Sequence, residues 1–177
     1  MRFLTVGTAL LAGLVLSTPA KAQKESEKLE VQQVIATMVE KDPGMQEWFD
    51  SAYGYVVFPS VGKGAIGVGG AHGNGLVYKG GELVAKSELI QVTVGLQIGG
   101  QSFVEVIFFK DETAFKDFGR GNFELSAQAS AVAFAAGASD AMAYNTGVAI
   151  VTMTQGGLMY EASVGGQKFK YEAIEGQ

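Results

Sequence analysis

Hydrophobic positions along the chain change from mainly helical to mainly strand-like spacing near residue 53. Between Lys24 and Lys41 the apolar residues recur at helical spacing, and most of the positions between them are charged or polar. The apolar stripe consists of Val31, Val34, Ile35, Met38 and Val39. This pattern predicts an amphipathic helix that packs one face against the rest of the domain.

A second, shorter helix is expected directly after the first. Asp42-Pro43 ends the first pattern, and aspartate favours the N-cap while proline favours the first helical position. Gly54 is the expected terminator. The buried stripe of this helix is expected to contain Met45, Trp48, Phe49 and Ala52.

Beyond residue 53, short apolar runs are separated by glycine-rich turns, which favours antiparallel hairpins. Asn74-Gly75 and Gly80-Gly81 are the expected turn pairs. The expected strands are YGYVVFPSV, AIGVGG, GLVYK, ELVAKS, LIQVTVGLQIG, SFVEVIFF, GVAIVTMT, GLMYEASVG and QKFKYEA. DETAFKDFG, residues 111–119, predicts a short helix. FELSAQASAVAFAAG predicts a strand with one flat alanine face, which another backbone or helix can approach closely.

These elements predict an α+β fold in which N-terminal helices pack on a glycine-rich, mainly antiparallel β-sheet or partly closed barrel. The helices are expected at about 24–52 and the strands over 53–177. Residues 23–177 are expected to form a single domain, because they are numerous enough to bury one hydrophobic core.

Residues 1–22 have the pattern of a secretory signal peptide. Arg2 precedes an apolar run, and the motif Ala-Lys-Ala ends at Ala22. We expect cleavage near Ala22, before Gln23, and a mature protein in the periplasm or outside the cell. The chain has no cysteine, which excludes disulfides, thiolate chemistry and a lipid anchor on a cysteine.

Acidic residues dominate the mature chain. Loss of Arg2 and Lys21 with the signal peptide leaves 11 basic and 18 acidic residues, a net charge of −7. Such a protein has no general attraction for nucleic acid or for an anionic membrane. No nucleic-acid partner is therefore expected.

The stretch GKGAIG, residues 62–67, matches the glycine pattern of a dinucleotide-binding loop. That loop needs a following helix, whose N-terminus holds the pyrophosphate. The next residues are VGGAHGNGLVYKGG, and each interior glycine costs a helix about 1 kcal/mol relative to alanine. The glycines are therefore assigned to a sheet, and no dinucleotide cofactor is expected.

Residue types that carry catalysis are sparse. His72 is the only histidine, and without converging partners it is interpreted as a structural turn residue. Asp140 is interpreted either as an isolated functional carboxylate or as a loop aspartate. No nucleophile with its base, metal-ligand spacing or phosphate-binding lysine motif is present. Enzymatic activity, a metal ion and a cofactor are therefore not expected.

Two basic residues flanked by glycines are the candidate ligand contacts. At Lys63, between Gly62 and Gly64, backbone amides and the ammonium could converge on an anion. The alternative is a solvated turn lysine. Arg120, which lies between two further glycines, has the same two interpretations.

Several long blocks of the sequence resemble the SYLF-domain family, including its secreted bacterial branch. The resemblance extends from about Asp42 to Glu172. The blocks are YGYVVFPSVGKGAIGVGGAHGNGLVY, VTVGLQIGGQSFVEVIFFKDETAFKDF, NFELSAQASAVA and GGLMYEASVGGQKFKYE. The resemblance implies binding to a phospholipid surface or an acyl ligand, and Lys63 is the residue that it carries over. Arg120, from its position between glycines, is the second candidate lipid-binding residue. Actin and cytoplasmic phosphoinositides, which eukaryotic members bind, are not expected as ligands of an exported chain.

Two functions remain open on this basis. The first is a non-enzymatic phospholipid-binding protein of the bacterial envelope. Its contact surface would combine the first helix, the alanine strand and Lys63, and the net charge requires this contact to be largely apolar or locally basic. The alternative is a structural or stress-related periplasmic protein that binds another envelope protein through a sheet edge.

Overall fold

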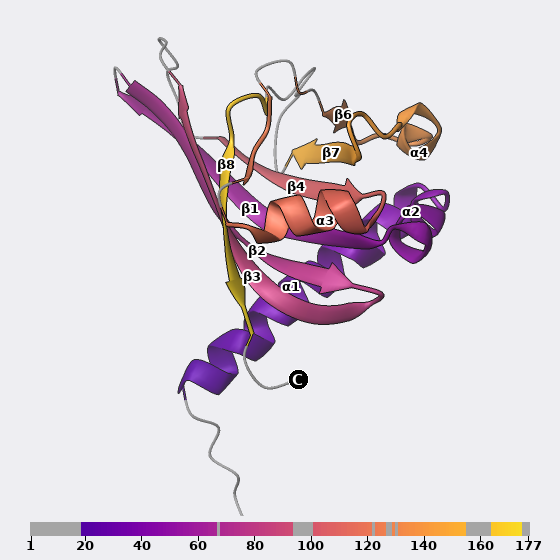
Figure 1. Cartoon of the computed structure of the whole chain (residues 1–177), viewed down its shortest axis with the longest axis horizontal. Helices are drawn as coiled ribbons and strands as arrows, with labels where there is room; N and C mark the ends of the chain where they lie inside the picture. Colours follow the sequence, from indigo (N-terminus) through magenta and orange to yellow (C-terminus); the bar gives the residue numbers. More distant parts are fainter. Residues whose placement is uncertain are drawn as a thin grey trace, which may run out of the picture.

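The computed structural model describes residues 19–66, 68–93, 101–121, 123–126, 129, 131–154 and 164–174. Its helices are α1 (Pro19–Lys41), α2 (Met45–Ser51), α3 (Glu112–Gly119) and α4 (Ala138–Ala141). Its strands are β1 (Gly54–Ile66), β2 (Val68–Lys79), β3 (Glu82–Thr93), β4 (Gln101–Phe109), β5 (Phe123–Glu124), β6 (Val132–Ala133), β7 (Val148–Thr154) and β8 (Lys168–Ala173) (Figure 1). The predicted signal peptide and the predicted strand GLMYEASVG lie almost wholly outside the described residues.

The described strands form one sheet in the order β5-β8-β3-β2-β1-β4-β7-β6. Neighbouring strands are antiparallel, except that β6 and β7 are parallel. The sheet curls into a half-barrel, and its two edges are the two-residue strands β5 and β6. The predicted α+β fold, with N-terminal helices on a mainly antiparallel sheet, is therefore confirmed.

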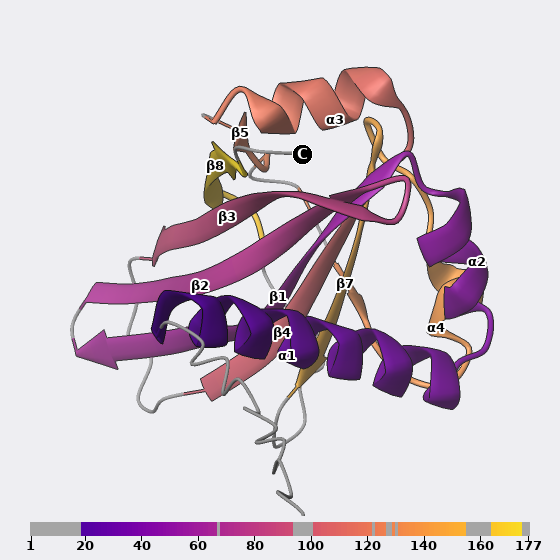
Figure 2. The ribbon, with the colours of Figure 1, turned by 90° about the horizontal axis from the view of Figure 1, so that it is seen from below.

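Both faces of the sheet are covered, by α1 on one side and α3 on the other (Figure 2). The α3-side core contains the buried residues Phe58, Ile107, Phe118 and Phe169 with their neighbours. The α1-side core contains Val31, Met38, Phe49, Val57 and Phe108 with their neighbours. Successive residues of a strand point to opposite faces, so the continuous apolar run of β1 contributes to both cores.

Strand β1 changes register at Pro59 against both of its neighbours. Proline has no N–H to donate to a ladder, and a register shift is where a central strand can hold it. Across from this point on β2, a Cβ added to Gly75 would lie 2.6 Å from the Phe58 ring and 2.8 Å from the carbonyl oxygen of Val57. Gly75 is therefore required by the close approach of an aromatic ring.

One of the two predicted turn pairs is wrong. Asn74-Gly75 lies inside β2, paired with β1 and β3, because this glycine makes room for Phe58 and does not supply a positive φ. Gly80-Gly81 is confirmed as a turn between β2 and β3, with φ of +56° and +82°. The predicted strand AIGVGG is divided between the end of β1 and the start of β2, and GLVYK is the last part of β2. The assignment of the GKGAIG glycines to a sheet is confirmed for residues 62–66.

The predicted alanine strand is also wrong. Among its described residues, the strands are β5, which pairs with β8, and β6, which pairs with β7 at the opposite edge of the sheet. The chain between them therefore crosses from one edge of the half-barrel to the other. Leu125, Ala129 and Ala131 pack into the α3-side core along this crossing. Their small or apolar side chains cover the core instead of forming a flat strand.

The N-terminal helices follow the predicted order, with a different junction. Helix α1 is confirmed, but α2 begins at Met45 after Gly44, so Asp42 and Pro43 do not occupy the predicted cap and first position. The Asp42 carboxylate instead accepts hydrogen bonds from the N–H of Gly44 (3.2 Å) and from the N–H and hydroxyl of Ser139 (both 2.8 Å). These bonds lower the pKa of Asp42 and join the α1–α2 junction to α4.

We expect Gly75→Ala to lower the free energy of unfolding by about 1–3 kcal/mol, because the added methyl group has no room beside Phe58. Gly62→Ala is the matched control on β1, where the nearest atom to an added Cβ is 4.0 Å away. The control should be neutral or slightly stabilising. Urea unfolding of both variants measures the difference, and equal stabilities would contradict the assigned role of Gly75.

Candidate functional site

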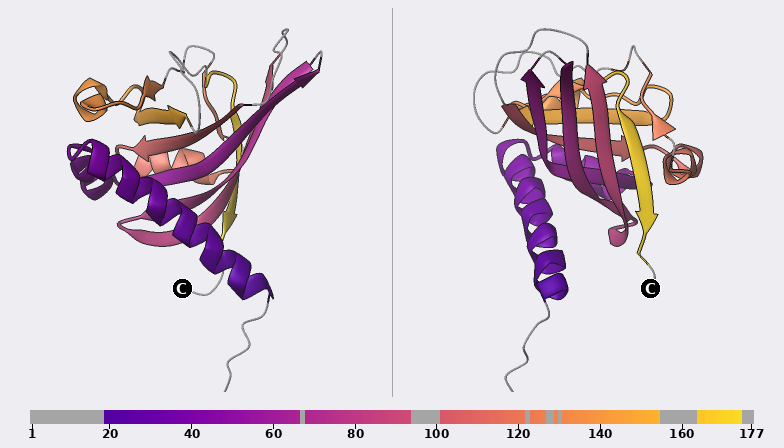
Figure 3. Two further views of the ribbon diagram at one scale, coloured as in Figure 1. Left: turned by 180° about the vertical axis from the view of Figure 1, so that it is seen from behind. Right: turned by 90° about the vertical axis from the view of Figure 1, so that its left-hand side faces the viewer.

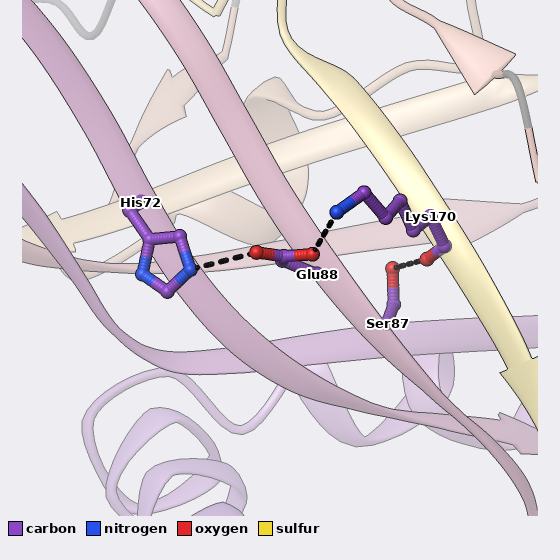
Figure 4. A network of polar contacts seen from close by, with 4 residues as sticks. All are labelled: His72, Ser87, Glu88 and Lys170. Atoms are coloured by element: carbon purple, nitrogen blue, oxygen red, sulfur yellow. Dashed lines mark hydrogen bonds and ion pairs between the residues drawn. The ribbon is translucent and has the colours of Figure 1, made fainter.

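A charged cluster spans three neighbouring strands on the α1 side of the sheet (Figure 4). The two carboxylate oxygens of Glu88 on β3 lie 3.0 Å from Nε2 of His72 on β2 and 2.6 Å from Nζ of Lys170 on β8. Glu88 and Lys170 are direct cross-strand partners. The prediction of a turn position for His72 is wrong, because the residue lies within β2 and its side chain is 58% exposed.

Hydrogen bonds from Lys170, and secondarily from His72, hold the pKa of Glu88 below its usual value. On the buried side of β3, the hydroxyl of Ser87 donates to the carbonyl oxygen of Lys170 at 2.7 Å. Lys170 is thus tied to β3 through both its backbone and its side chain. The carboxylate of Glu88 offsets the lysine charge, so the cluster carries little net charge.

A second lysine of β8 lies on the same face, two residues earlier. Lys168 is 70% exposed, and its ammonium lies 3.6 Å from a carboxylate oxygen of Glu124. Lys170 is 59% exposed. Exposed ion pairs in water contribute only about 0–1 kcal/mol, so such lysines exchange a carboxylate for another anion at little cost.

Lys63 lies within β1, where its backbone is opposite Ala71 of β2 and Gln101 of β4. Gly62 and Gly64 continue the same strand, so the local backbone belongs to the sheet. The turn position that the alternative interpretation gave to Lys63 is therefore wrong. The side chain of Lys63 lies outside the described residues, and its role in lipid binding stays a prediction.

Arg120 caps the C-terminal end of α3 and is followed by Gly121 at φ +77°. Its guanidinium is 76% exposed and lies 2.9 Å from the carboxylate of Asp117 on the same helix. The structure therefore does not bring Arg120 into the cluster of His72, Glu88 and Lys170. Its proposed lipid contact stays a prediction. Asp140, the other residue left open by the sequence, is an exposed residue of α4.

A groove of about 420 Å³ runs between the N-terminal half of α1 and the sheet. Its lining includes Glu27 and Glu30 of α1 and Lys86, Glu88 and Glu172 of the sheet. Lys86 donates to Glu27, which fastens α1 to β3. Carboxylates outnumber ammonium groups in this lining, so the groove is unsuited to an anionic headgroup.

A buried polar seam inside the half-barrel was missed by the sequence analysis. Glu105 and Gln167 are fully buried, and Nε2 of Gln167 donates to the Glu105 carboxylate at 3.0 Å. Gln91 donates to the carbonyl oxygen of Gly165 at 3.0 Å. These bonds fix the turn that precedes β8. The only sequence signal is a glutamate at an inward position of the apolar run SFVEVIFF.

Two absences, of a metal-ligand cluster and of a membrane-spanning helix, apply to the described part of the chain. Within it, three or more His, Cys, Asp or Glu residues nowhere gather as they would around a metal ion. None of the described helices combines the length and the hydrophobicity needed to cross a membrane.

Glu88→Gln should lower the free energy of unfolding by at most about 1 kcal/mol at pH 7, because the cluster is exposed. The pKa of Glu88 is depressed in the folded state, so its stabilising contribution is present above the usual value of 4.5 and is lost as pH falls through the folded value. The variant and the parent should therefore converge in stability as the pH falls well below 4.5. Urea unfolding between pH 3 and pH 7 tests this, and a pH-independent difference would contradict it.

Comparison with known proteins gives two findings that concern much of the described sheet. Residues 90–173 match the model of the Ysc84 family, described as Las17-binding protein actin regulator. Beta cell expansion factor A from Aeromonas veronii is 29% identical over 131 residues, which are 73% of this chain and 49% of that relative. The chain thus matches about half the length of this relative. Over residues 90–173, the chain is similar to the Ysc84 (SYLF) family, which confirms for this part the resemblance seen in the sequence.

Proposed function

We propose that this protein is a non-enzymatic phospholipid-binding protein of the bacterial envelope. The similarity to the Ysc84 (SYLF) family supports, at the level of the family, a module that binds lipid or actin. The signal-peptide pattern of residues 1–22 favours export, and an exported protein does not meet actin. A phospholipid surface is therefore the proposed partner.

The observation that carries this proposal is the pair of exposed lysines on β8. Lys168 and Lys170 project from one face of the sheet, where Lys168 pairs with the exposed Glu124 and Lys170 with the half-buried Glu88. A lipid phosphate can replace a carboxylate as the acceptor of a charge-assisted hydrogen bond. The predicted contact Lys63 lies in β1 of the same sheet, two strands from β3.

Electrostatic attraction makes only a limited contribution to this binding. A lysine near an anionic bilayer contributes about 1 kcal/mol, and the effect decays over a Debye length of about 8 Å at physiological salt. The predicted net charge of −7 opposes approach beyond that distance. Binding is therefore short-ranged and requires an apolar contribution.

The first helix and the alanine segment, which the sequence predicted as further parts of the lipid-contact surface, are not available for lipid contact. The predicted apolar stripe of α1, Val31 to Val39, packs into the α1-side core, and Leu125, Ala129 and Ala131 of the alanine segment cover the α3-side core. The alternative function, a partner bound through a sheet edge, finds little support. The edge strands of the described sheet are only two residues long and offer a short ladder for an added strand.

Lys168→Gln and Lys170→Gln should each weaken binding to anionic vesicles about fivefold at low salt. The measurement is co-sedimentation of the exported protein, recovered after processing of its leader, with phosphatidylglycerol-containing vesicles and with neutral vesicles. The difference between variant and parent should shrink at high salt, since screening weakens the lysine contribution.

Lys116→Gln is the matched control for these variants. Lys116 is 69% exposed and forms an ion pair with Glu112, but it lies on α3, away from the β8 lysines. The control should bind like the parent. An equal loss in all three variants would mean that only the overall charge matters, and the assignment of Lys168 and Lys170 would be wrong.

A further inference from the structure

Three strands extend beyond the rest of the sheet at one end (Figures 1 and 3). The pairing of β1 with β4 ends at Lys63 and Gln101, whereas its pairing with β2 continues to Ile66 and Val68. We call this extension the arm and define it as residues 64–66 of β1, 68–71 of β2 and 91–93 of β3. In the views of Figure 3, α1, α2 and α3 all lie away from the end of the arm.

Charged residues are missing from the strand segments at this end. The chain carries no Asp, Glu, Lys or Arg between residues 64 and 71, nor between residues 89 and 104. At the opposite end of the same strands, the β2–β3 hairpin runs from Lys79 to Glu82, and β4 is followed by Lys110, Asp111 and Glu112. The antiparallel topology therefore separates an uncharged end of the sheet from a charged end.

Val92 is the most exposed large hydrophobic side chain among the described residues. It is 71% exposed, and Leu29 of α1 follows at 56%. Val92 is exposed because the residues paired beside it are glycines. It is paired with Gly70 of β2, and Gly70 is paired with Gly64 of β1. Neither glycine has a side chain to cover the valine. The arm thus presents an apolar group on a thin strip of backbone.

Cationic groups lie directly behind this apolar end. Ile90, two residues before Val92, is paired with Lys168 of β8. Two residues of a strand span about 7 Å. The order along the strand axis is therefore an apolar end, then Lys168, then Lys170. A phospholipid leaflet has the matching order, with acyl chains beneath a layer of phosphates.

We infer that the arm inserts its uncharged end into the acyl region of a phospholipid leaflet, with Lys168 and Lys170 at the level of the phosphates. This inference rests on the proposed function and names the surface that performs it. The depth fits peripheral elements, which bury apolar groups about 5–10 Å into the boundary between headgroups and acyl chains. Insertion reconciles membrane binding with the net charge of −7 predicted for the mature chain, because the contacting end carries none of that charge.

The first test compares Val92→Glu with Leu29→Glu in vesicle co-sedimentation. Both parent side chains are exposed and apolar, so both variants gain one negative charge without disturbing a core. Val92→Glu should weaken binding to neutral and to anionic vesicles about tenfold or more. Leu29→Glu, on α1, should bind within about twofold of the parent. Unlike the effect of the lysine variants, the effect of Val92→Glu should persist at high salt.

The second test measures depth with tryptophan fluorescence. The chain has one tryptophan, Trp48 on α2, which packs against Phe108 and Tyr144. In the double variant Trp48→Phe, Val92→Trp, the new indole should shift to the blue on vesicle binding and be quenched by lipids brominated in the acyl chain. The parent, which fluoresces from Trp48, is the control and should show neither effect.

The outcomes separate the inference from the proposed function. If the parent sediments with no vesicle, both are wrong. If the parent binds but Val92→Glu behaves like Leu29→Glu and the indole of the double variant is not quenched, phospholipid binding stands and arm insertion is wrong. If light scattering shows a dimeric parent and a monomeric Val92→Glu variant, the arm is a contact between two copies of the chain, and the inference is again wrong.

Discussion

The burial of the central strands on both faces is the constraint on which the rest of the structure depends. Strand β1 supplies alternate side chains to two separate cores, so it needs α1 on one side and α3 on the other. A continuous apolar strand tolerates few departures from regular packing. Strand β1 shifts its register at Pro59 against both neighbours. Beside this shift, Gly75 of β2 leaves the space that the Phe58 ring occupies.

The same constraint leaves one end of the described sheet without a covering helix. The pairing of β1 with β4 ends at Lys63, and the arm continues beyond it, away from the helices. Glycines make this extension thin, because paired Gly64 and Gly70 leave Val92 without neighbouring side chains in its row. A sheet end of this kind is a liability in water unless it has a partner. An acyl layer is a partner that accepts apolar groups without requiring a specific fit.

The distribution of charged side chains agrees with insertion of the arm into a lipid leaflet. The β8 cations behind the arm are themselves exposed and are paired with the carboxylates of Glu124 and Glu88, so they contribute little to stability and can be reassigned to phosphate. The acidic groove beside α1 shares Glu88 with the β8 lysines, and its excess of carboxylates disfavours an anionic headgroup inside it. Net charge therefore limits long-range attraction, while the uncharged end of the sheet permits close contact.

The sequence by itself determined the helical stripe of α1, the short helix α3, the Gly80-Gly81 turn and the mainly antiparallel class of the sheet. These follow from local periodicity and from φ preferences, which act over a few residues. Tertiary structure alone decided that Asn74-Gly75 lies inside a strand, that the alanine segment crosses the half-barrel, and that Lys63 lies within a sheet. It also brought His72, Glu88 and Lys170 together across three strands, since cross-strand proximity depends on register, which no local pattern encodes.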